Sequence, residues 1–354
     1  MSYDNCHYVL GLMSGTSLDG LDLCFVCFEK SNQYKFKILH TKTITYDSVW
    51  EKKLKESIFL NKKNLEILNI EYSNLISVHI NQFIKEFSIA RVDFISSHGH
   101  TIFHEPNKGF TYQIGDGKII SEKTQINVVS NFRVQDIQYK GQGAPLVPIG
   151  DLLLFKDYKY CINLGGFSNI SIKNNGNIKA FDICPVNTVL NYYSNKLGHS
   201  CDVNGQLSKK GNINLELLDK LNKINFYKKI GPKSLGIEFV KSEVLPIINS
   251  FYLDPKDILK TYIEHITDQI SKFISDKHEK VLMTGGGVYN RTLISSLKKK
   301  TKTKLIIPKK ETIDYKEALI FAFIGLLKIK GEINCLKSVT GAIKNHSSGE
   351  IFRI

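Results

Sequence analysis

The feature that most constrains this fold is a pair of apolar stretches joined by a turn of small, hydroxyl and acidic residues. Residues 9–14 and 21–28 are mainly apolar, and the turn between them contains Gly15, Asp19 and Gly20. This pattern predicts a strand, a turn and a second strand. Glycines let backbone N–H groups approach a bulky anion, and Asp19 and Asp22 offer the hard oxygen ligands that Mg²⁺ prefers. The turn is therefore either a phosphate loop or an ordinary hairpin. A Walker loop does not fit, because no Gly-Lys-Ser/Thr ending or following helix is present.

The rest of the chain alternates strand-like and helical patterns, which indicates an α/β fold. The length of 354 residues suffices for two domains with a sizeable core each. Helical periodicity is clearest over residues 64–90 and recurs at 254–277 and 314–330. We expect one domain over residues 1–138 and a second over 139–354, with the segment from about residue 331 free to pack back on the first.

Composition narrows the class of partner. The net charge of +14 comes from lysines spread along the chain, and the one dense run, over residues 298–304, has no interleaved aromatic residues, which favours a small anionic ligand over nucleic acid. No apolar run reaches the length of a membrane span and no secretory signal is visible, so we expect a cytoplasmic protein with no membrane partner. Cys24 and Cys27 fall on opposite faces of a strand, so reduced thiols are favoured over zinc.

Two further glycine-rich turns follow the first. Residues 160–172 read as strand, Gly-Gly turn and strand, and so repeat the first hairpin. Residues 281–290 read as a strand, a Gly-Gly-Gly turn and a helix start, where adenosine could lie against bare backbone. Three such turns in this order predict phosphate hairpins in two domains that face each other across an ATP cleft.

Polar side chains at expected strand ends are candidates for chemistry. His98 and Thr101 are suited to hydrogen bonding a ligand; a structural histidine is the main alternative, and a metal site formed with His100 and His104 is the least favoured, since no acidic or thiolate partner is adjacent. Arg133 could bind a carboxylate or phosphate through its planar fork, or pair with Asp136. Asp182 could act as a general base or cap the next helix.

Glu317 begins an apolar helix. There it could reach a ligand hydroxyl or simply favour the helix dipole.

Read in order, these segments resemble the anhydro-N-acetylmuramic acid kinases over essentially the whole chain. The most specific strings are GLMSGTSLDGLD and GQGAPLVP, and further matches are NLGGFSNIS, GPKSLG, TGGGVYN and VTGA. The resemblance implies an actin-like, two-domain α/β kinase, usually a homodimer, that uses ATP and Mg²⁺. Its substrate would be 1,6-anhydro-N-acetylmuramic acid from peptidoglycan recycling, and its product N-acetylmuramic acid 6-phosphate.

The resemblance also implies roles for individual residues. Asp182 and Glu317 would be catalytic, and His98, Thr101, Arg133 and Asn187 would bind the sugar. Asp19 would be the candidate Mg²⁺ ligand. The implied ATP-binding residues are Gly15, Thr16, Ser17, Leu18, Asp19, Gly20, Leu21, Asp22, Gly165, Gly166, Gly285, Gly286, Gly287 and Asn290.

Some strings depart from the commoner family pattern. HGHT and NFR stand where HGQT and DFR are usual, and FDICPVN stands for FDTGPGN. The last change puts Cys184 and Val186 beside the proposed base and leaves the pocket geometry open. Two alternatives remain: a kinase of the same fold acting on an ordinary sugar hydroxyl, and a non-catalytic ATP-dependent binding or sensor module.

Overall fold

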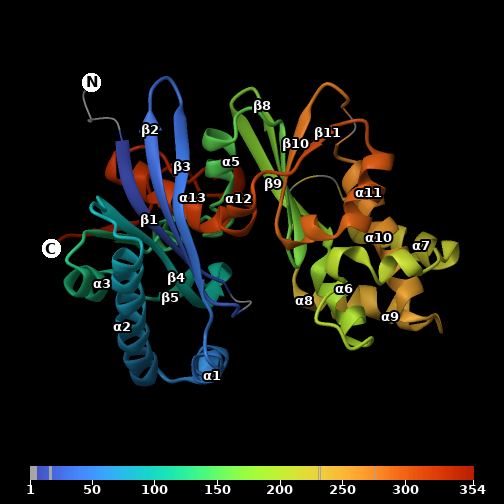
Figure 1. Ribbon diagram of the computed structural model, residues 1–354, viewed down its shortest axis with the longest axis horizontal. Coiled ribbons are helices and arrows are strands. Elements are labelled where there is room, and N and C mark those ends of the chain that lie inside the picture. The colour runs from blue at the N-terminus through green and yellow to red at the C-terminus, as the bar shows by residue number, and fades with distance from the viewer. Residues whose placement is uncertain (1–5, 16–17, 230, 232, 275) are drawn as a thin grey trace. The chain divides into compact units, whose positions relative to one another are not determined.

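The structure is a computed structural model that describes residues 6–15, 18–229, 231, 233–274 and 276–354 (Figure 1). The chain forms two compact units. The first unit comprises residues 1–154 and 315–354, and the second comprises residues 155–314. These units place residues 139–154 and the whole segment after 314 with the N-terminal part. The boundary expected at 138/139 and the return expected near residue 331 do not coincide with the limits of these units. The division into domains 1–138 and 139–354 stays a prediction.

The first unit is built on a mixed sheet with the strand order β12-β6-β4-β1-β2-β3, in which β5 pairs with β4. Its strands are β1 (Cys6–Ser14), β2 (Leu21–Lys30), β3 (Tyr34–Ile44), β4 (Phe94–Glu105), β5 (Phe110–Ile114), β6 (Val128–Ser130) and β12 (Glu350–Phe352). Its helices are α1 (Ser48–Glu56), α2 (Lys62–Glu86), α3 (Gly117–Thr124), α4 (Val134–Gln138), α5 (Pro148–Leu154), α13 (Lys316–Ile329) and α14 (Lys337–Thr340).

The second unit has a mixed sheet with the order β11-β10-β7-β8-β9. Its strands are β7 (Tyr160–Leu164), β8 (Phe167–Asn174), β9 (Asn177–Pro185), β10 (Lys280–Thr284) and β11 (Lys304–Ile306). Its helices are α6 (Asn187–Asn195), α7 (Leu215–Asn222), α8 (Ile237–Phe239), α9 (Leu245–Asn249), α10 (Pro255–Ser271), α11 (Arg291–Lys300) and α12 (Lys310–Asp314).

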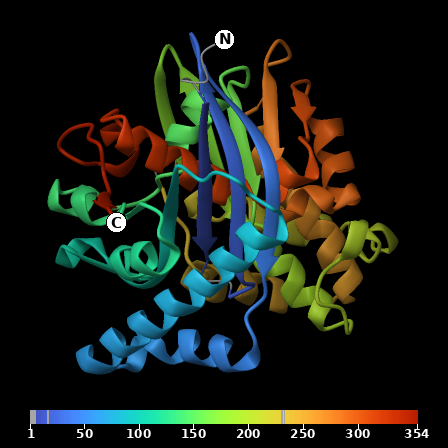
Figure 2. The same ribbon diagram turned by 60° about the vertical axis from the view of Figure 1, so that its left-hand side comes forward.

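The two sheets repeat one topology. In each, three consecutive strands form an antiparallel meander, β1-β2-β3 or β7-β8-β9. The first meander strand then pairs in parallel with a later strand, β4 or β10, and that strand with the next, β6 or β11. Figure 2 shows the β1–β3 meander as three long adjacent strands. The predicted α/β class, with a mixed sheet flanked by helices in each half, is confirmed.

Helices cover both faces of the first sheet. The face that carries Leu10 and Leu12 packs against α2, whose buried stripe includes Leu68, Tyr72 and Ile76. The predicted helix over residues 64–90 is thus confirmed, with Asn61 as its N-cap. The other face packs against α13 so closely that a Cβ at Gly11 would lie 2.2 Å from the carbonyl oxygen of Ala318. That approach fixes the first turn of α13, which carries Glu317, over β1.

Candidate active site

The turn between β1 and β2 is the first predicted phosphate loop. Gly20 has φ +148° and a Cβ there would lie 2.4 Å from the Ile44 carbonyl oxygen, so the close approach of β3 requires glycine. The Asp19 side chain is exposed, which suits a cation ligand, and Gly15, Leu18 and Leu21 frame the turn. Thr16 and Ser17, which were also predicted to bind ATP, lie outside the described residues.

Asp22 is held by a contact that the sequence did not indicate. The Thr43 hydroxyl on β3 donates to Asp22 Oδ1 (2.6 Å) and lies 3.1 Å from the hydroxyl of Tyr315. Tyr315 is the N-cap residue of α13, so this chain of hydroxyls joins Asp22 to the turn that carries Glu317. A carboxylate held in this way keeps a fixed position beside the predicted phosphate loop.

A buried polar network lies at the end of β1. Ser14 Oγ is 2.8 Å from His100 Nδ1 and 2.7 Å from the Tyr46 hydroxyl, which in turn lies 2.6 Å from the Tyr72 hydroxyl. Burial lowers the pKa of His100 to about 4, so the ring is neutral near pH 7. His100 is the residue that departs from the usual HGQT string, and here it orients Ser14 directly before the turn.

His98 and Arg133 contact each other in the first unit. His98 on β4 has Nδ1 2.9 Å from the Gly99 carbonyl oxygen, so Nδ1 is the donor and Nε2 accepts from Arg133 Nε (2.9 Å). Burial and the nearby guanidinium hold the pKa of His98 well below its usual range. Both ring nitrogens are engaged, so a bond from His98 to a sugar hydroxyl stays a prediction and requires one of these bonds to be exchanged.

Arg133 is fixed by hydrogen bonds rather than by an ion pair with Asp136. Its Nη1 donates to the Gly143 carbonyl oxygen (2.7 Å) in the GQGAP segment. Burial lowers its pKa to about 10, and the Glu317 carboxylate works in the opposite direction, so the group stays charged at neutral pH. Three of its five N–H groups remain beyond the bonds to His98 and Gly143.

Glu317 faces this guanidinium from α13. Glu317 is exposed on the surface of the first unit. The protein atoms around its carboxyl nevertheless raise its pKa by desolvation, and the positive charges of Arg133 and Lys316 oppose that rise. Lys316 itself forms a buried ion pair with Asp151 (2.8 Å). The first unit therefore gathers Glu317, Arg133 and His98 into one polar group.

Thr101 lies on β4 opposite Gln113, and its role in binding the sugar stays a prediction.

In the second unit, Asp182 lies on β9 with its backbone and side chain both held by one loop. Its Oδ2 accepts from Leu235 N (2.8 Å), and its N–H donates to the Lys233 carbonyl oxygen (2.9 Å). Desolvation raises the pKa of Asp182, and the hydrogen bond from Leu235 works against that rise. A half-buried carboxylate with a raised pKa is suited to general-base chemistry. The helix-cap alternative does not describe it, since α6 begins at Asn187 with Val186 as N-cap.

The second predicted phosphate hairpin is bonded to the segment that follows Asp182. Val186 N and Thr188 N donate to the Gly166 carbonyl oxygen, and Asn187 N donates to that of Gly165. The Asn187 amide also donates to the Leu164 carbonyl oxygen (3.2 Å). The hairpin turn and the proposed base therefore belong to one rigid piece of the second unit.

The third glycine-rich turn packs against the same hairpin. Gly285 has φ +82°, and a Cβ there would lie 2.7 Å from the Leu164 carbonyl carbon. A Cβ at Gly287 would lie 2.7 Å from Leu164 Cβ, whereas at Gly286 it would find room. Asn290 is buried, and its Oδ1 caps α11 by accepting from Leu293 N (2.9 Å). Its role in binding ATP stays a prediction.

The unusual residues beside Asp182 point into the core. Cys184 and Val186 are each 0% exposed and pack within the apolar cluster under β7–β9, α6 and α10. The Cys184 thiol lies 3.3 Å from Ser168 Oγ. The two departures from the glycine-containing string thus fill the interior rather than a solvent-facing surface.

Val186→Gly should therefore lower the free energy of unfolding by about 2–4 kcal/mol, because it removes a fully buried side chain. Urea denaturation measures this loss. We expect kcat and KM to change less than about threefold at a temperature where the variant is folded. A large loss of turnover with unchanged stability would contradict the assignment of Val186 to the core.

Sequence reasoning missed two contacts that position these groups. The Leu235 N–H belongs to the GPKSLG string, which matched the family but received no role. The Thr43–Tyr315 pair joins residues 272 positions apart, and no local pattern signals it.

A repeated meander-plus-parallel topology, with a glycine turn after the first strand of each sheet, defines an actin-like kinase fold. A family model described as anhydro-N-acetylmuramic acid kinase matches residues 7–354. Anhydro-N-acetylmuramic acid kinases from Bacillus cereus (strain 03BB102) and Bacillus anthracis are each 31% identical over 97% of this chain and 98% of their own length. The chain belongs to the anhydro-N-acetylmuramic acid kinase family, and the family assignment made from the sequence is confirmed.

Two solved structures show lower similarity to this chain. Component A of the (R)-2-hydroxyglutaryl-CoA dehydratase of Acidaminococcus fermentans is 14% identical, with a TM-score of 0.45 over 88% of this chain and 95% of its own. Hexokinase from Schistosoma mansoni is 8% identical, with a TM-score of 0.33 over 90% of this chain and 84% of its own. Within the described residues, none of the helices combines the length and apolar character needed to cross a membrane.

Proposed function

We propose that this protein is an ATP-dependent kinase that opens 1,6-anhydro-N-acetylmuramic acid with water and phosphorylates O6. The observation that carries the proposal is Asp182: a half-buried carboxylate with a raised pKa, held by Leu235 in the segment next to a phosphate hairpin. Family membership over residues 7–354 supports the choice of substrate. We further propose that it acts in the cytoplasm as a homodimer, in the recycling of cell-wall sugars.

The chemistry follows from the bond that ties O6 to C1. Asp182 takes a proton from a water molecule, the water oxygen attacks C1, and the C1–O6 bond breaks. O6 then attacks the γ-phosphoryl group of ATP, and ADP leaves. Glu317, whose pKa is also raised, is assigned to a sugar or nucleotide hydroxyl beside the Arg133 guanidinium. Catalysis of such a transfer depends mainly on positioning and on neutralising charge.

The residues of the β1–β2 turn fit a magnesium nucleotide. Asp19 is exposed and Asp22 is held by Thr43, so both offer carboxylate oxygens next to glycines that leave the backbone accessible. Mg²⁺ bound there would neutralise charge on the ATP phosphates. Gly165, Gly166 and the 285–287 turn are assigned to the phosphates and adenosine in the second unit.

A product assay tests the proposed function. Purified protein is incubated with Mg·ATP and either anhydro-N-acetylmuramic acid or N-acetylmuramic acid, and the products are identified by mass and by the position of the phosphate. We expect the 6-phosphate from the anhydro sugar. Faster conversion of the open sugar would point to an ordinary hydroxyl kinase, and ATP hydrolysis unaffected by either sugar would point to a sensor module.

Asp19→Ala tests the assignment of the first turn. We expect the affinity for ATP in the presence of Mg²⁺ to fall roughly tenfold or more, because one hard oxygen ligand or water-holding group is lost. Affinity in the presence of EDTA should change little. Calorimetric titration under both conditions measures the difference, and an equal loss with and without Mg²⁺ would show that Asp19 does not act through the metal. Asp219→Ala, on an exposed part of α7, is the matched control.

A further inference from the structure

The first unit contains a buried group of three potential metal ligands that the proposed reaction does not use. Asp136 on α4, Cys335 after α13 and His346 before β12 are 0%, 1% and 6% exposed. Their ligand atoms all lie within 4.8 Å of one another. An isolated antiparallel bridge fixes two of them, because Cys335 N donates to the His346 carbonyl oxygen (3.0 Å) and His346 N to that of Cys335 (3.1 Å).

The imidazole of His346 presents an unusual contact. Its Nδ1 lies 3.1 Å from the Lys344 carbonyl oxygen, which makes Nδ1 the donor and leaves the lone pair of a neutral ring on Nε2. Within the described part of the chain, no hydrogen-bond donor reaches Nε2, and it faces Asp136 Oδ1 at 3.5 Å. Two acceptors in a buried place repel each other unless a proton or a cation lies between them.

Three features favour a metal cation over a proton. The donor set is one thiol, one imidazole and one carboxylate, which together suit zinc. Cys335 Sγ lies 3.0 Å and His346 Nε2 lies 3.5 Å from Asp136 Oδ1. Ligands at zinc bond lengths in a tetrahedron lie about 3.3–3.6 Å apart, so both of these separations are within about half an ångström of that range. The bond from Nδ1 to a carbonyl is also the usual second-shell support of a metal-bound histidine.

We propose that Asp136, Cys335 and His346 bind a zinc ion that fastens the C-terminal segment to α4. Binding displaces the thiol proton of Cys335, which now points at Asp136, and that proton leaves to solvent. Thr340 Oγ1, 2.8 Å from Asp136 Oδ1, or a water molecule completes the shell.

The site is linked to the polar group around Arg133. Asp136 Oδ2 accepts from Gly143 N (2.7 Å), and the Gly143 carbonyl oxygen accepts from Arg133 Nη1. A Cβ at Gly141 would lie 2.1 Å from Asp136 Oδ2, so the GQGAP segment is wrapped closely around this carboxylate. Zinc at Asp136 would therefore act as a structural support for Arg133 and take no part in the reaction.

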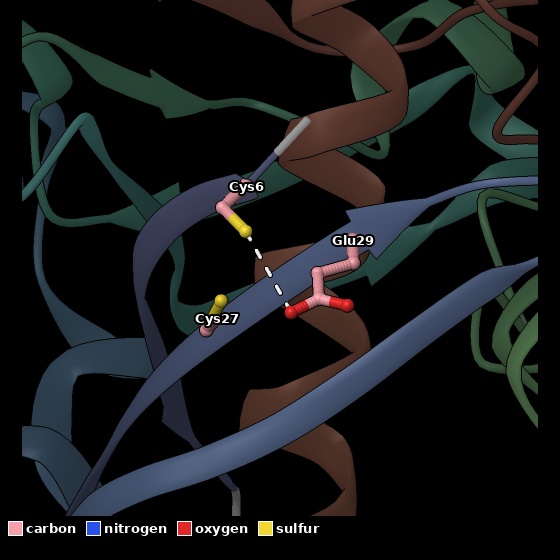
Figure 3. Close-up of side chains that lie close together, drawn as sticks. All are labelled: Cys6, Cys27 and Glu29. Carbon is pink, nitrogen blue, oxygen red and sulfur yellow. Dashed lines mark hydrogen bonds between the residues drawn. The ribbon is translucent and has the colours of Figure 1, made fainter. Parts of the chain in front are cut away.

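A second group of thiols provides an internal control. Figure 3 shows Cys6, Cys27 and Glu29 on β1 and β2, with Cys6 Sγ 3.6 Å from Glu29 Oε1. Glu29 is exposed, and the positive charge of Lys37 acts on Cys27. This group has weaker burial and a cation beside it, so it should bind zinc less tightly than the buried group.

The test measures metal content and cobalt spectra of the full-length protein. Wild-type protein, dialysed against zinc and then against buffer, is analysed for metal, and metal-free protein is titrated with Co²⁺. Cys335→Ser is the main variant because serine can still donate to Asp136 but offers no thiolate. His346→Gln is a second variant in case the first does not fold, and Cys27→Ser is the matched control.

We expect about one zinc per wild-type chain and a thiolate-to-cobalt charge-transfer band. Cys335→Ser should abolish the band and lower zinc affinity at least about a hundredfold, since loss of an outer-shell partner alone costs 10–100-fold. His346→Gln should lower it similarly, and Cys27→Ser should leave both readouts unchanged. Wild-type protein without bound zinc, or a band lost in Cys27→Ser and kept in Cys335→Ser, would overturn the proposal whatever the kinase assay shows.

Discussion

Asp182→Asn should lower turnover by roughly a hundredfold or more while the protein stays folded, as expected for loss of a general base. The asparagine carbonyl oxygen can still accept from Leu235 N, so the contact that positions the side chain survives and only the basicity is lost. Steady-state kinetics with anhydro-N-acetylmuramic acid measure the effect, and ATP affinity should remain near the wild-type value. Asp219→Asn, whose carboxylate pairs with Lys223 on an exposed helix surface, is the matched control.

The pH dependence of turnover gives an independent readout of the same group. A base acts in its deprotonated form, so kcat should fall as pH drops through the pKa of Asp182. Desolvation raises that pKa above the ordinary aspartate value, and the acidic limb should therefore lie higher than for an exposed carboxyl. Near-normal turnover in a folded Asp182→Asn variant would refute the assignment, as would an acidic limb that the substitution leaves in place.

Arg133→Ala should raise KM for anhydro-N-acetylmuramic acid at least about thirtyfold if the guanidinium binds the lactyl carboxylate. Loss of one member of a buried charge pair costs about 2 kcal/mol or more, which corresponds to that factor. Anhydro-N-acetylglucosamine lacks the carboxylate, so its KM should change little. The N–H groups not used by His98 and Gly143 are the ones available for this contact.

Two further measurements separate this role from a structural one. Arg133→Lys keeps the charge without the planar fork and should recover only part of the affinity. Arg91→Ala, which removes an exposed arginine paired with Asp93, should leave both KM values unchanged. Equal losses for the two sugars in Arg133→Ala would assign Arg133 to the phosphate or to the support of His98 and would leave the kinase assignment intact.

Local patterns predicted a large part of the fold. The strand over residues 160–164 agrees with β7, and the helix expected over 314–330 agrees with α13 to within two residues. Both are encoded by the spacing of apolar side chains, which reflects which face is buried. By contrast, we expected His98 and Thr101 near the end of a strand, whereas they lie inside β4, which continues to Glu105. β1 and β5 pair with this stretch and bury it, and pairing between distant segments leaves no local signal.

The metal-ligand group illustrates a different limit. The sequence drew attention to the CxxC string of Cys24 and Cys27, whose members lie on opposite faces of β2. Cys335 and Asp136 are 199 residues apart, and Cys335 and His346 do not have a familiar ligand spacing. Such a group can be recognised only from the structure, in which the C-terminal segment contacts Asp136 on α4.

The glycine turns, the α/β character and the family were predictable from the chain alone, because these depend on residue identity and on short-range periodicity. The tertiary structure was needed to show which donors meet which acceptors. It engaged both nitrogens of His98, placed Leu235 on the Asp182 carboxylate and turned Cys184 and Val186 into the core. These contacts depend on which strands and loops become neighbours, and hydrogen bonds between distant segments leave no periodic signal in the chain that forms them.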